Sequence, residues 1–154
     1  MIRADVPELL RLMRSIVSFE RGEDFRLDEA EILRRGFADR PEFGAYIADS
    51  GDGSLVGMAV HYEIPFMHTL QPLLMLKWLY VDPEWRGGRV GQKLMRQMAL
   101  HARANGHLRF CWFVLNDNLP AQAFYRSLGA TEDAEWRRWI LSAEALDGLI
   151  EREH

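Results

Sequence analysis

The stretch W-R-G-G-R-V-G-Q-K-L at residues 85–94 decides how the rest of the chain is interpreted. It follows an apolar, strand-like run over Leu73–Val81 and a turn at Pro83, and it opens a helix-like segment. Glycine lets a backbone approach an anion closely, and a helix N-terminus presents unpaired N–H groups and a partial positive charge. The stretch therefore predicts a phosphate-binding loop for a diphosphate-bearing cofactor. Because a short glycine motif is weak alone, an ordinary polar turn is the alternative.

Length and composition predict one globular domain over residues 1–154. The chain has 154 residues, of which 48% are hydrophobic and 27% charged. These proportions are typical of a soluble protein with a sizeable core. Its 19 basic and 23 acidic residues give a net charge of −4. A mildly acidic chain without a run of Lys or Arg offers little to nucleic acid or to an anionic membrane, so neither is expected as a partner.

Cysteine and histidine usage bears on redox compartment and metal binding. The single Cys111 excludes an intrachain disulfide and fits a reducing compartment. The histidines show no metal-ligand spacing, so no metal is expected. No stretch reaches membrane-spanning length and the N-terminus lacks a signal-peptide pattern, which predicts a cytoplasmic protein.

Two helices are predicted at the start of the chain. Asp5 as N-cap, Pro7 in the first turn and Glu8 three residues after Asp5 are typical of a helix start. An apolar stripe at helical spacing follows, made of Leu9, Leu10, Met13, Ile16 and Val17. A second helix is predicted over residues 28–37.

The pattern then changes to strands. Residues 44–48 and Leu55–Ile64, joined by S-G-D-G at residues 50–53, predict a hairpin. Leu73–Val81 is apolar on both faces except at Lys77, which predicts a strand covered by helices. A helix with apolar residues one turn apart follows from Val90 and is ended by Gly106.

The remaining elements complete a mixed α/β pattern. A strand is predicted over residues 108–115, then a short helix that begins at Asn118 and ends at Gly129. A strand pair over residues 131–141 and a short helix from Ser142 follow. The strand–helix–strand unit around the glycine loop predicts a right-handed parallel crossover.

Two linked signatures resemble those of the GNAT-type N-acetyltransferases. The first is Y-V-D-P-E-W-R-G-G-R-V-G at residues 80–91. The second joins V-L-N-D-N-L-P-A at residues 114–121 to A-F-Y-R-S-L-G-A at residues 123–130. The order and separation of the signatures match that family, and so does the element order over nearly the whole chain. The second signature and Ser18-Phe19-Glu20 are most similar to the diamine branch, the spermidine/spermine-like acetyltransferases.

The resemblance implies a fold and a co-substrate. The fold would be α/β, with a mixed, largely antiparallel sheet whose central parallel strand pair is splayed around the coenzyme, flanked by helices. Acetyl-CoA would place its pyrophosphate on the loop formed by Arg86, Gly87, Gly88, Arg89, Val90, Gly91 and Gln92. Further coenzyme contacts would come from the strand edge at Leu79, Tyr80 and Val81 and from Asn118, Ala121 and Phe124.

The resemblance also implies a mechanism. The neutral amine of an acceptor would attack the thioester directly, and a strand-edge N–H at residues 79–81 would stabilise the oxyanion. Tyr125 matches the family tyrosine that protonates the departing thiolate as a general acid. A buried aromatic side chain on a helix face is the alternative for Tyr125.

Two positions depart from the family pattern. The loop is usually (Q/R)-x-x-G-x-(G/A), and Arg89 stands where the pattern has glycine. A side chain is tolerable there if φ stays negative, and its guanidinium either reaches a phosphate or ends the loop exposed. The polyamine enzymes carry an acidic pair in the strand before the loop, where this chain has Lys77 and Trp78.

The lysine bears on the acceptor. Lys77 would repel a polycation, so an acceptor with an acidic group beside its amine, such as an amino acid or an aminophosphonate, is favoured. Its alternative role is to extend into solvent at a strand edge.

Several side chains could carry the acceptor's proton or bind the acceptor. Glu63 and His61 alternate onto one strand face, and Glu20, Glu23 and Asp24 fall on the presumed acceptor side, so no single base is fixed. The candidate acceptor residues are Phe19, Glu20, Glu63 and Lys77.

The function expected from these patterns is N-acetyl transfer to a small primary amine. A homodimer is expected from the family and from the aromatic residues Trp136 and Trp139. The alternatives are a protein or peptide N-acetyltransferase, a non-catalytic acyl-CoA-binding module, and a plain interaction domain.

Overall fold

A four-stranded mixed sheet organises the first of two compact units. The computed structural model describes residues 1–20, 26–66 and 70–151, and its units are Met1–Leu115 and Asn116–His154. The strands are β1 (Gly44–Asp49), β2 (Leu55–Ile64), β3 (Leu73–Val81) and β4 (Arg109–Trp112), in the order β1-β2-β3-β4. The pairs β1–β2 and β2–β3 are antiparallel and β3–β4 is parallel. The predicted α/β class and mixed, largely antiparallel sheet are confirmed.

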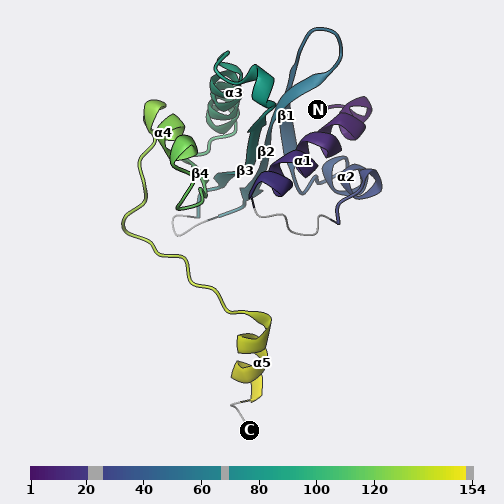
Figure 1. Ribbon diagram of the computed structural model, residues 1–154. Helices are drawn as coiled ribbons and strands as arrows, with labels where there is room; N and C mark the ends of the chain where they lie inside the picture. The colour runs from purple at the N-terminus through teal and green to yellow at the C-terminus, as the bar shows by residue number, and fades with distance from the viewer. Residues whose placement is uncertain (21–25, 67–69, 152–154) are drawn as a thin grey trace. The chain divides into compact units, whose positions relative to one another are not determined.

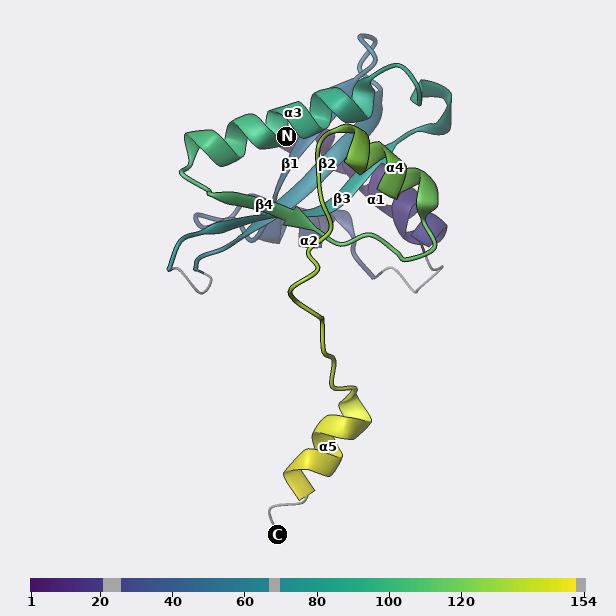
Figure 2. The ribbon, with the colours of Figure 1, turned by 90° about the vertical axis from the view of Figure 1, so that its left-hand side faces the viewer.

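Helices cover both faces of this sheet. Figures 1 and 2 show α1 (Val6–Glu20) and α2 (Glu29–Gly36) on one face and α3 (Val90–Ala104) on the other. Short 3-10 turns precede α1 (Arg3–Asp5) and follow β3 (Pro83–Trp85). No helix within the described ranges is long and apolar enough to cross a membrane.

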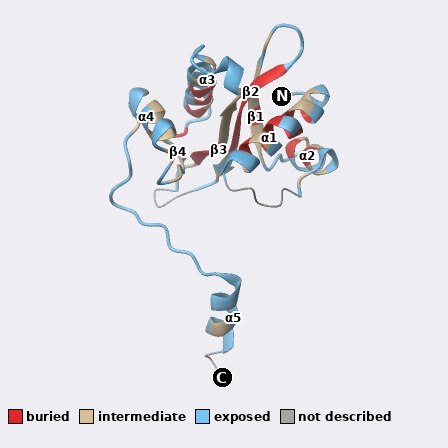
Figure 3. Ribbon diagram, in the orientation of Figure 1, coloured by how far each residue is buried: buried red, intermediate tan, exposed pale blue. Residues whose placement is uncertain are grey.

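The main core lies between α1 and the sheet. The periodic apolar residues of α1 are buried there against Ile32 of α2 and Met58 of β2. Figure 3 shows burial concentrated on β2 and on the sheet-facing sides of α1 and α3. Burial of this apolar area, at about 25 cal/mol per Å², is the main force that holds the two layers together.

The two predicted helix signals at Asp28 and Asn118 are confirmed in detail. Asp28 is the N-cap of α2 and its carboxylate accepts a hydrogen bond from the Glu31 N–H at 2.8 Å. In the second unit, Asn118 is the N-cap of α4 (Leu119–Ser127) and its Oδ1 accepts from the Ala121 N–H at 3.2 Å. Helix α5 (Ala143–Glu151) follows where a short helix was predicted.

The C-terminal strand predictions are partly wrong. The strand predicted over residues 108–115 is limited to β4, and residues 131–141 contain no strand. A strand needs a hydrogen-bonding partner, which alternation of apolar and polar residues cannot guarantee. The parallel pair β3–β4 consequently lies at the edge of the four-stranded sheet, not at its centre.

The pairing of β3 with β4 stops halfway along β3. It runs from Leu73 opposite Arg109 to Leu76 opposite Trp112. Beyond Leu76, no strand of the described ranges pairs with the β4-facing edge of β3. Residues 79–81, which have no partner strand on this side among the described residues, are called the free edge of β3, and the splay of the strand pair around a coenzyme stays a prediction.

Candidate functional site

The loop between β3 and α3 has the backbone that an anion site needs. Gly87 adopts φ +81°, and Arg89, the N-cap of α3, adopts φ +65°. No side chain caps this helix end, and the first helical hydrogen bond runs from the Lys93 N–H to the Arg89 carbonyl at 2.9 Å. The N–H groups of Val90, Gly91 and Gln92 therefore lack an intrahelical acceptor, so an anion can accept from them.

The condition of a negative φ at Arg89 is not met, since its φ is +65°. A left-handed backbone suits glycine, which the family pattern has at this position, and a side chain there costs about 1 kcal/mol. The loop geometry is retained in spite of the substitution. No hydrogen bond or ion pair is recorded for the Arg89 side chain within the described residues, so its role toward a phosphate stays a prediction.

An ion-pair group anchors the start of the loop. The Arg11 guanidinium of α1 lies 3.2 Å from the Asp82 carboxylate and 3.1 Å from Glu8, and it donates to the Leu55 carbonyl at 2.6 Å. The Asp82 N–H donates to the Val56 carbonyl at 2.9 Å. These bonds join α1 and β2 to the first residue of the loop. Sequence analysis missed the group, because residues 71 positions apart give no local signal.

A glycine of β2 lets α3 approach the sheet. A Cβ on Gly57 would lie 3.2 Å from Val90 Cγ1, 3.3 Å from Leu94 Cδ1 and 3.1 Å from the Tyr80 carbonyl oxygen. These distances leave no room for a side chain without movement of the helix. Gly57 thus determines how closely the first turn of α3 lies to the sheet, and with it the position of the loop.

Two of the predicted acceptor residues, Glu20 and Lys77, meet Trp78 at the end of α1. Partial burial raises the pKa of the Glu20 carboxyl, against the charge of Lys77 and a hydrogen bond from the Trp78 side chain. The Lys77 ammonium lies 5.1 Å from the centroid of the Trp78 ring. The structure therefore brings a carboxylate, an ammonium and an indole together in one place.

A β-bulge sets the position of Lys77. In the β2–β3 pairing Val60 lies opposite Trp78 and His61 lies opposite Leu76, so Lys77 is the extra residue. Bulges redirect side chains and often occur beside functional sites. This one falls directly after Leu76, the last residue of β3 that pairs with β4. Lys77 is exposed, whereas the four residues before it are buried.

The Arg86 side chain extends this surface. Its Nε–H donates to the Val81 carbonyl at 2.9 Å, and its guanidinium carbon lies 5.7 Å from the Tyr80 ring centroid and 6.0 Å from that of Phe19. Phe19, another predicted acceptor residue, thereby lies beside the loop. We define the acceptor surface as Phe19, Glu20, Lys77, Trp78 and Arg86.

Glu63, in contrast, contacts a different group of residues. Its Oε1 lies 3.4 Å from both His101 Nε2 and His107 Nε2, at the C-terminal half of α3. His61 is buried beside His101, with ring centroids 4.6 Å apart and ring planes tilted by 52°. The other candidate bases, Glu23 and Asp24, lie outside the described residues.

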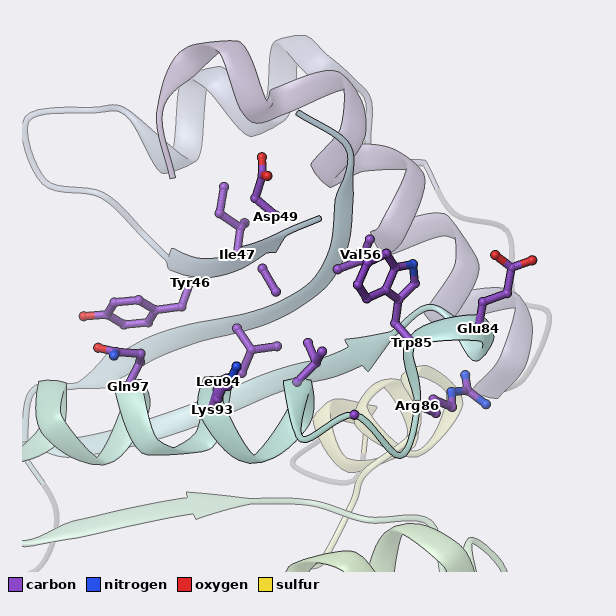
Figure 4. A pocket seen from close by; sticks show the side chains of 13 residues that line it. Tyr46, Ile47, Asp49, Val56, Glu84, Trp85, Arg86, Lys93, Leu94 and Gln97 are labelled. Atoms are coloured by element: carbon purple, nitrogen blue, oxygen red, sulfur yellow. The ribbon is translucent and has the colours of Figure 1, made fainter. Parts of the chain in front are cut away.

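A cavity of about 530 Å³ lies beside the loop, between β1 and the first turns of α3 (Figure 4). Residues of β1, β2, the 3-10 turn, the loop and α3 line it: Tyr46, Ile47, Ala48, Asp49, Val56, Glu84, Trp85, Arg86, Gly88, Val90, Lys93, Leu94 and Gln97. Figure 4 shows the Arg86 side chain pointing away from it. The cavity borders the β1 edge, whereas the predicted pantetheine contacts at residues 79–81 belong to β3.

The second unit carries the predicted acid on α4. Tyr125 lies in the helix that Asn118 caps, and its ring is 5.3 Å from that of Phe124. Its carbonyl accepts hydrogen bonds from Leu128 at 3.0 Å and Ala130 at 3.2 Å, which close the C-terminal end of the helix. The signature thus forms one capped helix with Ala121, Phe124 and Tyr125 in it.

The fold and these motifs define an acyltransferase class, and comparison with known families agrees. The Acetyltransferase (GNAT) family model matches residues 8–130. The chain therefore belongs to the GNAT family, and the protein is an acetyl-CoA-dependent N-acetyltransferase.

Relatives of known activity share sequence over most of the chain. Thialysine N-epsilon-acetyltransferase of Sus scrofa is 30% identical over 156 residues, which cover 94% of this chain and 91% of that protein. The Mus musculus protein of the same name is 29% identical, with 97% and 94% covered. Spermidine/spermine N(1)-acetyltransferase-like protein 1 of Homo sapiens is 28% identical, with 89% of this chain but 21% of that protein covered.

Solved structures confirm the fold. An integron cassette protein from V. cholerae superposes with a TM-score of 0.78 at 21% identity, covering 98% of this chain and 94% of that one. An aminoglycoside acetyltransferase from a soil metagenome gives a TM-score of 0.75 at 21% identity, with 92% and 93% covered.

Proposed function

We propose that this N-acetyltransferase acetylates the side-chain amine of a small amino-acid-type acceptor. The observation that carries the proposal is the acceptor surface, where one carboxylate and two cationic side chains lie together on aromatic rings. Opposite charges in one site suit a zwitterion better than a polycation. The similarity to thialysine N-epsilon-acetyltransferases supports the same class, because thialysine is an amino acid with a terminal amine.

Binding of acetyl-CoA is assigned to the loop and the free edge of β3. The pyrophosphate would accept from the N–H groups at the start of α3, where glycines and the left-handed Arg89 expose the backbone. The edge of β3 at Leu79, Tyr80 and Val81, where Arg86 Nε already donates to the Val81 carbonyl, would bond the pantetheine amides through its remaining groups, as a strand would. Asn118, Ala121 and Phe124 complete the proposed contacts.

The acceptor would be oriented by charge. Lys77 and Arg86 attract a carboxylate, and Glu20 attracts an ammonium. Since burial raises the pKa of the Glu20 carboxyl, this group also holds a proton more readily than an exposed glutamate, which suits a relay of the ammonium proton through water. The neutral amine then attacks the thioester, and an N–H of the β3 edge stabilises the oxyanion.

Tyr125 is proposed as the general acid. The departing thiolate of the coenzyme has an ordinary pKa of about 8.5 and a phenol one of about 10, so the proton transfer is close to balanced. The tyrosine lies in the second family signature, on the well-capped helix α4.

An acceptor panel tests the proposal. Release of free thiol from acetyl-CoA is measured with thialysine, lysine, an aminophosphonate, spermidine, an aminoglycoside and a peptide. The proposal expects the amino acids to give the highest kcat/KM and spermidine to give at least a tenfold lower value. Preference for spermidine or for the peptide would replace this acceptor class with another.

A further inference from the structure

A group of titratable side chains lies between the sheet and the C-terminal half of α3, outside the proposed catalytic surface. We define the histidine cluster as Tyr46, His61, Glu63, His101 and His107. Ring centroids are 4.6 Å apart for His61 and His101, 6.0 Å for His101 and His107, and 5.8 Å for Tyr46 and His61. His61 and His107 are only 9% and 7% exposed.

The polar contacts within the cluster are incomplete. The Tyr46 hydroxyl lies 3.2 Å from His101 Nδ1, and Glu63 Oε1 lies 3.4 Å from the Nε2 atoms of His101 and His107. His61 Nδ1 and His107 Nε2 are buried without a hydrogen bond of good geometry. Two buried nitrogens without hydrogen bonds lower the free energy of unfolding, so packing of the core alone does not explain the cluster.

The charges around His61 oppose its protonation. Burial lowers its pKa to about 4, helped by His101, His107 and the N-terminal amine, and opposed by Glu63. Two imidazolium rings 4.6 Å apart repel each other strongly at reduced dielectric. Among the described residues, Glu63 is the one carboxylate whose charge raises the pKa of His61. It can compensate one added charge, but not two or three.

We propose that the histidine cluster is a pH-sensitive lock that holds the C-terminal half of α3 on the sheet. At neutral pH the uncharged His61 ring packs against its neighbours, and in mild acid proton uptake by His61 forces the rings apart. The sign follows from linkage: an exposed histidine binds its proton near pH 6.5, whereas His61 in the closed state binds only near pH 4. Between these values the open state binds more protons, so a falling pH favours opening.

The lock lies on the helix that carries the coenzyme loop. Helix α3 begins directly after Arg89, and the rise of 1.5 Å per residue places His101 about 16 Å from Val90 along the axis. The C-terminal half of α3 also leads through His107 into β4. Opening of the lock would therefore loosen the connection between α3 and the parallel strand pair before the loop itself is affected.

Thermal unfolding of the full chain at pH 7.5, 6.0 and 5.0 tests the lock. For one histidine with these two pKa values, the unfolding equilibrium shifts by about 30-fold between pH 7.5 and 5.0. His61→Leu removes that component, so its Tm should fall by about 4–8 °C less than that of the wild type over this range.

Two measurements on the wild type keep the test decisive if the variant folds poorly. Imidazole NMR signals of His61 should titrate below pH 5, and hydrogen exchange, corrected for its intrinsic pH dependence, should rise first over residues 97–108. Normal titration of all three rings, or uniform exchange, would overturn the lock. So would a rise in Tm with Zn²⁺ that EDTA reverses, because the cluster would then be a metal site.

Discussion

At the residue scale, the two departures from the family pattern have different consequences. Arg89 has the left-handed backbone that glycine adopts freely. The arginine therefore raises the conformational free energy of the loop more than it changes the shape of the loop. Lys77 changes the charge of the acceptor surface and stands at a β-bulge. The sequence drew attention to both positions, but neither the φ of Arg89 nor the bulge has a local signal.

The charge of Lys77 should determine acceptor preference. Lys77→Glu reverses the charge beside Glu20, so we expect kcat/KM for thialysine to fall at least tenfold and that for spermidine to rise. Lys77→Met, which keeps the length of the side chain without its charge, is the matched control. It should lower kcat/KM for thialysine without raising kcat/KM for spermidine. An unchanged ratio of the two kcat/KM values for Lys77→Glu would show that Lys77 only extends into solvent.

Replacement of Arg89 by glycine separates backbone strain from phosphate contact. Arg89→Gly should raise the free energy of unfolding by about 1 kcal/mol, since glycine adopts a positive φ freely. A simultaneous loss of acetyl-CoA affinity in calorimetry would assign the guanidinium to a phosphate. A destabilised Arg89→Gly variant would contradict the strain argument.

The hydroxyl of Tyr125 should matter for turnover and not for coenzyme binding. Tyr125→Phe is expected to lower kcat about 100-fold, the usual contribution of a general acid, with the Kd of acetyl-CoA unchanged. Tyr62→Phe on β2 serves as the matched control and should keep its kcat. Full turnover of Tyr125→Phe would remove the residue as the acid.

At the element scale, local signals predicted the helices and strands well, and long-range contacts were not predictable. The apolar run gave Leu73–Val81 with the observed bounds, and the Asn118 cap gave the start of α4. The absent strands at residues 131–141 show the limit, because pairing depends on a distant partner. The Arg11–Asp82 ion pair and the histidine cluster depend in the same way on tertiary contact.

Gly57 should control the position of α3. Gly57→Val would push against Val90 and Leu94, which typically costs about 1–3 kcal/mol and displaces the first turn of the helix. In thermal shift assays, we expect acetyl-CoA to raise the Tm of this variant by less than it raises that of the wild type. We expect this loss to exceed the fall in the Tm of the free protein. Gly53→Val, in the β1–β2 turn with nothing nearby, is a control for general destabilisation, because Gly53 adopts a positive φ that valine disfavours. Equal loss of coenzyme stabilisation in both variants would argue against a specific role of Gly57.

At the scale of the whole molecule, the family match spans both compact units, since residues 8–130 extend past Leu115. The single domain over residues 1–154 and the homodimer stay predictions, and the strands that were to carry Trp136 and Trp139 are absent. Light scattering should give about twice 17.9 kDa if the dimer forms.

The central claim is acetyl transfer from acetyl-CoA to an amino-acid-type amine. The most direct measurement incubates the full chain with acetyl-CoA and thialysine and follows free thiol together with the mass of the acceptor. The account predicts that thiol and a product carrying one acetyl group form in equal amounts, and faster than with spermidine. Tight binding of acetyl-CoA with no thiol release for any amine would contradict it.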